Sequence, residues 1–169
     1  MNKLIEKALK FATKQHGDIN QRRKYTNEPY IVHPIAVAKT VKEYGGTPEM
    51  IAAGLLHDVV EDTPTTLGDV YNQFGLTVGV YLSYLTDVAV SSDGNRATRM
   101  NINNCHLVFA PPPVHTIKLA DIYDNVQSIA KHDPKFAEVY VEEKKIQILF
   151  LKKGNTALYN KVFQYLRSL

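Results

Sequence analysis

The sequence predicts an all-α fold, built as one compact bundle of about eight to ten helices. Apolar residues recur at helical spacing along most of the chain. Residues that start and stop helices, above all Thr, Asp, Pro and Gly, divide the chain into segments of helical length. The 169 residues suit a single domain, 1–169, and are enough to bury a core without disulfide bonds.

The composition narrows the class of protein and of partner. The formal net charge of +3 gives no strong basic field for nucleic acid. The one cysteine, Cys105, fits a reducing compartment and is better interpreted as a small, semi-buried apolar residue than as a nucleophile. The chain starts with a charged, amphipathic segment and has no apolar run of membrane-spanning length. We therefore expect a soluble, cytoplasmic protein without a signal peptide and without a membrane or nucleic-acid partner.

The first third of the chain predicts two helices separated by a polar loop. Residues 2–16 place apolar side chains on one helical face. Residues 17–29 break this period and carry the basic cluster 21–25, which fits either a solvated loop or a phosphate clamp. Pro34 suits the first turn of a second helix, which Gly45-Gly46 ends.

The next helix carries the most informative stretch of the sequence. Thr47-Pro48 opens it, and Thr63-Pro64 stops it. Its first half is as apolar as a core helix, and its second half carries four ionisable groups within six positions, His57, Asp58, Glu61 and Asp62. In a continuous helix, His57 stacks over Glu61, and Asp58 stacks over Asp62. Acidic groups at a helix C-terminus oppose the helix dipole, so the arrangement needs a compensating cation and favours a metal site. The alternative is a helix end that emerges into water.

Four segments predict helices in the middle of the chain. Thr66 caps a short helix that ends at Gly75, and residues 76–88 continue as helix, although their valines and tyrosines also suit a strand. After a loop at 91–94, the helix 95–108 displays Arg96 and Arg99. The triple proline 111–113 is a rigid break before a long helix, 114–131.

The chain ends with two further helices. Asp133-Pro134 starts the first, which runs through residues 146–151 to Gly154, and a last short helix reaches the C-terminus. No internal repeat or low-complexity segment interrupts this order.

Several motifs together resemble one known family. His33, then His57-Asp58, then Asp121 is the H…HD…D order of the HD superfamily of metal-dependent phosphohydrolases. The stretches 55–63 (LLHDVVEDT) and 117–121 (IKLAD), with Arg23-Lys24 before 30–34 (YIVHP), resemble the hydrolase domain of RelA/SpoT homologues more closely. This resemblance extends from the first helix to about residue 150. It implies an HD-domain helical bundle and a stand-alone small alarmone hydrolase.

The resemblance implies a set of metal ligands. They are His33, His57, Asp58 and Asp121, and the family's ion is usually Mn²⁺. Two imidazoles and two carboxylates form a mixed nitrogen and oxygen set that suits one divalent first-row ion with positions open for water and phosphate. A closed tetrahedral zinc site with thiolates is the less suitable alternative.

The resemblance also implies catalytic and substrate-binding residues. Glu61 and Asp62 match the catalytic acidic pair, which positions or deprotonates water and handles the leaving-group proton. Substrate contacts are implied for four residues: Arg23, stacking on guanine, Lys24, at the phosphates, Asn125, near the nucleotide, and Tyr140, near the base or ribose.

These inferences predict a Mn²⁺-dependent pyrophosphohydrolase of guanosine 3′,5′-bispyrophosphate, (p)ppGpp, and related alarmones. Its products are GDP or GTP and pyrophosphate, and it could serve as an antitoxin to a toxic alarmone synthetase. The alternatives are an HD phosphohydrolase of another nucleotide (an adenosine alarmone, NADPH or a nucleoside monophosphate) and a nucleotide- or protein-binding domain with a structural metal. Residues 101–113 depart from the family pattern, and the sequence leaves their role, the preferred alarmone and the oligomeric state open.

Overall fold

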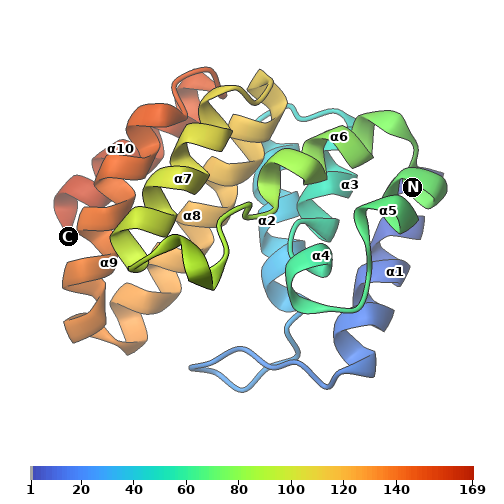
Figure 1. Ribbon diagram of the computed structural model, residues 1–169, viewed down its shortest axis with the longest axis horizontal. Helices are drawn as coiled ribbons and strands as arrows, with labels where there is room; N and C mark the ends of the chain where they lie inside the picture. Colours follow the sequence, from blue (N-terminus) through green and yellow to red (C-terminus); the bar gives the residue numbers. More distant parts are fainter. Residues whose placement is uncertain (1) are drawn as a thin grey trace.

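The computed structural model describes residues 2–169, and within them the fold is all-α, as predicted (Figure 1). Residue 1, with which the predicted domain begins, lies outside this range. The only β-type pairing in the described residues is an isolated bridge between Arg22 and Pro29. Ten α-helical segments follow one another: α1 Lys3–Asp18, α2 Val32–Glu43, α3 Pro48–Leu56, α4 Val59–Asp62, α5 Leu67–Phe74, α6 Leu76–Leu85, α7 Arg96–Val108, α8 Pro112–His132, α9 Pro134–Gln147 and α10 Thr156–Ser168. Two 3₁₀ turns, η1 Ser91–Asp93 and η2 Ile148–Phe150, lie between them.

Most predicted helix starts are correct because their capping residues are local in sequence. The Thr47 and Thr66 side chains accept hydrogen bonds from the backbone N–H groups of Met50 and Asp69. Thr66 and Asp69 form a reciprocal capping box. Asp133 in turn caps α9. Of the predicted helix 76–88, residues 76–85 are helical as α6, so the strand alternative is wrong and the predicted end is three residues too late.

Two predicted boundaries need correction. The triple proline does not separate two helices as a rigid break, because Pro112 and Pro113 form the first turn of α8. The first turn needs no backbone N–H donor, and proline has none to offer. The predicted long helix through residue 151 ends at Gln147 instead, and its final part is the turn η2.

Helix α3 lies at the centre of the bundle. Every residue from Met50 to Leu56 is buried, since α3 packs against α1, α2, α6 and α8. A helix that is apolar on all sides is stable in water only when other elements bury it on all sides. The second central element is α8, which packs against α2, α3, α9 and α10. Figure 1 shows α1 to α6 on one side of the molecule and α7 to α10 on the other, so that α2, α3 and α8 meet between them.

One element differs from the prediction in a way that matters for the site. The predicted single helix from residue 48 to 62 is broken, with α3 ending at Leu56 and α4 beginning at Val59. The His57 ring bonds the Gly54 carbonyl oxygen with its Nδ1, at 2.9 Å. A side chain that takes a carbonyl near the helix end competes with the backbone ladder and favours termination there. The break therefore falls on the histidine and aspartate of the HD motif.

Candidate metal and catalytic site

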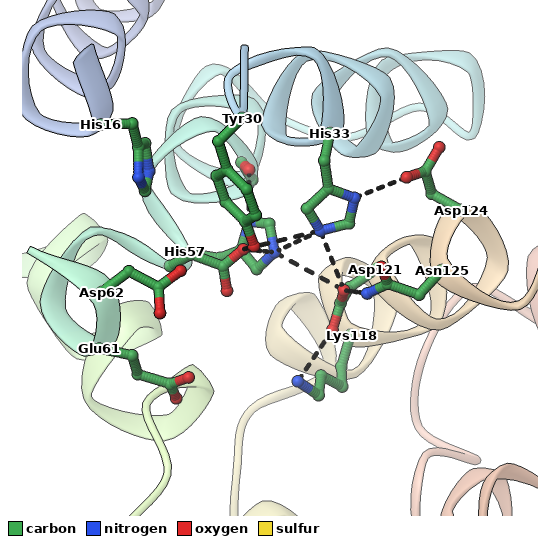
Figure 2. A network of polar contacts seen from close by, with 12 residues as sticks. His16, Tyr30, His33, His57, Glu61, Asp62, Lys118, Asp121, Asp124 and Asn125 are labelled. Atoms are coloured by element: carbon green, nitrogen blue, oxygen red, sulfur yellow. Dashed lines mark hydrogen bonds and ion pairs between the residues drawn. The ribbon is translucent and has the colours of Figure 1, made fainter. Parts of the chain in front are cut away.

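Four side chains from three parts of the fold converge on one point (Figure 2). His33 comes from α2, His57 and Asp58 from the break between α3 and α4, and Asp121 from α8. The Nε2 atoms of the two histidines lie 3.2 Å apart. Asp121 Oδ1 lies 3.3 Å from His33 Nε2 and 3.6 Å from His57 Nε2. Asp58 Oδ2 lies 3.0 Å from His57 Nε2 and 3.6 Å from His33 Nε2. The structure thus brings together all four of the predicted ligands.

The outer contacts of the histidines determine which ring nitrogen faces this point with a lone pair. His57 Nδ1 bonds the Gly54 carbonyl, which can only accept, so Nδ1 carries the proton. His33 Nδ1 lies 2.6 Å from Asp124 Oδ2, and an ionised carboxylate also only accepts. Both neutral rings therefore direct an Nε2 lone pair inward. The contact between Asp124 and His33 resembles the carboxylate–histidine pairs that are common at metal sites.

The donor set fits a divalent cation. Two imidazole lone pairs and two carboxylate oxygens facing one another repel unless positive charge lies between them. Neighbouring ligands of an ion bound at about 2.1 Å in octahedral geometry lie about 3 Å apart, close to the separations found here. His33, His57 and Asp58 also form a cluster of potential ligand atoms that all lie within 4.8 Å of one another.

The electrostatics of the four residues reflect the same need for positive charge. Burial alone would lower the pKa of His57, but Asp58 and Asp121 hold it well above the usual value. The pKa of His33 is also raised, against burial, by Asp121 and Asp124. Burial would raise the pKa of Asp121, but the Lys118 ammonium and both histidines hold it well below its usual range. Protons and a metal ion therefore compete for the same atoms.

Three further side chains contact the predicted ligands. Tyr30 and Lys118 were not predicted as parts of the site, and Asn125 was predicted as a substrate contact. The Tyr30 hydroxyl donates to Asp58 Oδ2 at 2.6 Å. Lys118 Nζ lies 2.9 Å from Asp121 Oδ2, and Asn125 Nδ2 donates to Asp121 Oδ1 at 2.7 Å. Each carboxylate is thus held by a donor besides the histidines. The contacts of Lys118 and Asn125 with Asp121 could have been predicted from the spacing of the three residues along one helix. The contact of Tyr30 with Asp58 could not, because it depends on how α2 and α4 pack.

The acidic pair lies on α4, on the other side of His57 from Asp124 and Asn125 (Figure 2). Because the helix breaks at residues 57 and 58, the predicted stacking of these residues on one continuous helix is wrong. Glu61 Oε1 accepts a hydrogen bond from the Asp87 backbone N–H at 2.6 Å. Partial removal from water raises the pKa of the Glu61 carboxyl to about 7, although this hydrogen bond and Lys118 oppose the shift. A carboxyl with this pKa can both take up and release a proton near neutral pH.

Asp62 is held from the opposite direction. Gln21 Nε2 donates to Asp62 Oδ2 at 2.9 Å, and Gln21 Oε1 lies 2.6 Å from His16 Nδ1. His16 lies in the last turn of α1. It is nevertheless only 1% exposed, and its ring lies 4.9 Å from that of Tyr30. Sequence reasoning missed this link because it joins α1, a loop and α4.

Arg23 lies beside Asn125, as expected for neighbours in one substrate site. Its Nη1 donates to Asn125 Oδ1 at 3.3 Å, and its Nη2 lies 3.5 Å from Asp124 Oδ2. A cavity of about 260 Å³ adjoins these side chains. Its lining includes Arg23, Lys24, Tyr25, Tyr30, Asn125 and Phe136.

Lys24 and Tyr140 both lie near Phe136. The Lys24 ammonium lies 4.8 Å from the centre of the Tyr25 ring and 5.7 Å from that of Phe136. The Tyr140 ring lies 5.8 Å from Phe136 and has the Lys144 ammonium 4.9 Å from its centre. Both residues thus border the region that carries Arg23, but neither contacts one of the four predicted ligands.

A second cavity, of about 270 Å³, extends from Lys118 along α7 and α9. Its cationic lining residues are Arg96, Arg99, Lys118 and Lys144. Asn103, from the segment 101–113, lines it as well, and its Oδ1 accepts hydrogen bonds from the N–H groups of Val88 and Ala89. This segment forms the end of α7 and the start of α8.

Comparisons with known proteins agree with this geometry. Residues 8–148 match the HD domain family. The chain is 37% identical over 126 residues to the guanosine-3′,5′-bis(diphosphate) 3′-pyrophosphohydrolase of Aquifex aeolicus, covering 74% of this chain and 18% of that protein. It is 36% identical over 126 residues to the GTP pyrophosphokinase of Streptomyces antibioticus, covering 74% of this chain and 15% of that protein. The chain therefore spans less than a fifth of the length of these relatives.

A solved structure matches almost the whole fold. It is that of a metazoan orthologue of SpoT that hydrolyses ppGpp and plays a role in starvation responses. The TM-score is 0.87 at 26% sequence identity, and the match covers 99% of this chain and 96% of that one. In the described residues, no helix is both long enough and apolar enough to cross a membrane.

Proposed function

Because the chain belongs to the HD domain family, among its RelA/SpoT-type members, we propose that it hydrolyses the 3′-pyrophosphate of (p)ppGpp and related alarmones. The products are GDP or GTP and pyrophosphate. The observation that carries this proposal is the convergence of His33, His57, Asp58 and Asp121 beside the acidic pair. The reaction named for the Aquifex aeolicus relative and the ppGpp hydrolysis of the metazoan SpoT orthologue support it.

In this proposal the four convergent residues hold one divalent ion, and Mn²⁺ is the ion we propose. The mixed imidazole and carboxylate set suits a first-row divalent ion of this kind. When bound, such an ion lowers the pKa of water and withdraws charge from a phosphate oxygen. Asp124, Tyr30, Lys118 and Asn125 keep the ligating atoms oriented through the contacts described above.

Glu61 and Asp62 handle the protons of the reaction. They lie on α4, next to the ligands but outside the set of converging atoms. One carboxylate accepts a proton from the attacking water, and a protonated carboxyl can return one to the leaving 3′-oxygen. A pKa of about 7 makes Glu61 suitable for either step near neutral pH.

The nucleotide is held by the elements on both sides of α8. Arg23 and Asn125 border the cavity of about 260 Å³, which has aromatic walls suited to a base. Lys24 and Tyr140 flank the same region. The neighbouring cavity has more cations than carboxylates in its lining, as a polyphosphate requires. Its cations are Arg96, Arg99, Lys118 and Lys144, and its carboxylates are Asp87 and Glu143, of which Glu143 pairs with Arg96.

The test is an assay of purified protein with Mn²⁺ and guanosine 3′,5′-bispyrophosphate, measuring GDP and pyrophosphate. Release by the wild type and none by Asp62→Ala supports the proposal. No release by a metal-loaded wild type contradicts it. A panel of adenosine alarmones, NADPH and nucleoside monophosphates then tests the alternative HD phosphohydrolases, whose ligand set is the same.

Three finer points belong to the same proposal. Residues 1–169 form one phosphohydrolase domain, supported by the packing of α10 against both α8 and α9. The protein works in the cytoplasm, where a free thiol such as Cys105 is stable. The Cys105 side chain is exposed, so the semi-buried position expected from the sequence is wrong. It protects cells from a toxic alarmone synthetase by turnover, so co-expression of Asp62→Ala should fail to protect them.

A further inference from the structure

His16 and Gln21 form a link from α1 to Asp62, one residue of the acidic pair. Gln21 lies in the loop after α1, and its backbone is fixed on both sides. Its N–H donates to the His16 carbonyl at 3.0 Å, and its carbonyl accepts from the Tyr30 N–H at 3.1 Å. Its side chain then crosses to Asp62 on α4.

The donor and the acceptor of each hydrogen bond in this link follow from the chemistry of the Asp62 carboxylate, the Gln21 amide and the His16 ring. The Asp62 carboxylate only accepts, so the Gln21 amide must present its NH₂ group to Asp62. The amide oxygen then faces His16 Nδ1 at 2.6 Å, and this nitrogen must carry the proton. Burial lowers the pKa of His16, so the ring stays neutral near pH 7 with its single proton on Nδ1.

The link is built into the core at one end and open to solvent at the other. His16 is 1% exposed, whereas Asp62 is exposed. His16 Nε2 is buried without a hydrogen-bond partner, so the ring makes its one polar contact through Gln21. A polar ring kept in the core with one unsatisfied nitrogen costs stability. Such a cost points to a role beyond packing.

We propose that Gln21 and His16 are positioning residues that hold the Asp62 carboxylate in one orientation for proton transfer. This inference rests on the proposed function, in which Asp62 is a catalytic residue. An exposed aspartate at the end of a short helix, as Asp62 is on α4, has several rotamers available to its side chain. The Gln21 amide selects one of them, and His16 in turn keeps the amide from flipping.

The test uses the metal-loaded protein, four single variants and the Asp62→Ala background. Gln21→Met keeps the shape of the side chain and removes the amide. His16→Leu removes the donor to Gln21, whereas His16→Asn places an amide N–H where Nδ1 was. Gln164→Met, on the exposed face of α10, is the matched control.

Gln21→Met and His16→Leu should each lower kcat about tenfold and leave KM and metal content unchanged. This loss is smaller than the ~10²–10⁴-fold loss expected when the acid–base group itself is removed. His16→Asn should keep most of kcat, and Gln164→Met all of it. In an Asp62→Ala background, Gln21→Met should lower the remaining kcat by less than twofold, because its effect passes through Asp62. An unchanged kcat in Gln21→Met, or an equal loss in the Asp62→Ala background, overturns the inference.

Crystal structures of the wild type and of Gln21→Met separate this inference from the proposed function. The Asp62 side chain should show one rotamer in the wild type and several in the variant. One rotamer in both contradicts positioning, whatever the activity. If the wild type is inactive but Asp62 takes several rotamers in Gln21→Met, the proposed function is overturned while the positioning of Asp62 by Gln21 stands.

Discussion

The Nε2 atoms of His33 and His57 lie 3.2 Å apart, while the Nδ1 atom of each ring bonds an acceptor that faces away from this contact. In their neutral form, both rings are therefore held in the tautomer that directs the Nε2 lone pair toward Asp58 and Asp121. The two rings are thus oriented by contacts within the protein itself.

Divalent metal should stabilise the fold. At 100 times its Kd, Mn²⁺ should add about 2.7 kcal/mol to the free energy of unfolding, or roughly 5–10 °C in Tm for a chain of this size. His57→Ala should abolish this gain, and Asp62→Ala should keep it. Thermal unfolding with and without Mn²⁺ measures both. Loss of the gain in Asp62→Ala would mean that Asp62 is a ligand.

Metal binding should strengthen as the pH rises. The pKa values of His33 and His57 lie above the ordinary 6.5, so protons occupy the ligating nitrogens at mildly acidic pH. Protons and metal compete, and the Tm gain at a fixed Mn²⁺ concentration should grow from pH 6 to pH 8. Thermal melts at both pH values measure it, and an equal gain at both would contradict the competition.

Asp62→Ala should lose turnover while binding nucleotide and metal. Removal of a general acid–base group should lower kcat by ~10²–10⁴-fold with little change in KM. Asp18→Ala, which removes an exposed carboxylate at the end of α1, is the control and should keep full activity. Steady-state kinetics of pyrophosphate release measure this.

Arg23→Ala should mainly weaken substrate binding. Arg23 adjoins Asn125 and the cavity with aromatic walls, away from the four converging atoms. Its loss should raise KM about tenfold or more, since stacking and charge act in the bound state as well as in the transition state. Arg167→Ala on α10 is the control. A fall in kcat at constant KM would argue against base stacking.

Lys144→Met should stabilise the protein at neutral pH. Burial lowers the pKa of Lys144 to about 8 from the ordinary 10.5, so the folded state holds this proton less tightly than the unfolded chain. The resulting penalty is fully present below pH 8 and disappears as the pH rises from 8 to 10.5. Melts from pH 7 to pH 10.5 should therefore show a gain in Tm that shrinks with pH. A constant gain would mean that packing causes it.

The fold could be predicted largely because its signals are local. Caps such as Thr66 and Asp133, and glycine at Gly75 with a φ of 85°, act within a few residues of the helix they bound. The order of His33, His57-Asp58 and Asp121 was likewise readable from the sequence. The break at His57 was not, because apolar periodicity continues through it and the bond to Gly54 depends on the ring's orientation.

The supporting residues of the site were harder to predict. Asp124 follows Asp121 by three positions, so its place on the same face of α8 could have been inferred from spacing. The contact of Tyr30 with Asp58 and the link from His16 through Gln21 join segments far apart in the chain. Such contacts depend on how α1, α2 and α4 pack, which periodicity within one helix does not encode.

The break between α3 and α4 also divides the site into two modules. The four predicted ligands come from α2, α8 and the break that follows α3, whereas Glu61 and Asp62 lie on a four-residue helix tied by Asp87 and Gln21. Asp87 holds Glu61 through its backbone N–H, which a side-chain substitution leaves in place, whereas Gln21 holds Asp62 through its side chain. A substitution at Gln21 can thus change the proposed rate of reaction without disturbing the core that carries the predicted ligands. Evolution can then retune turnover and metal affinity separately, through mutations in different parts of the chain.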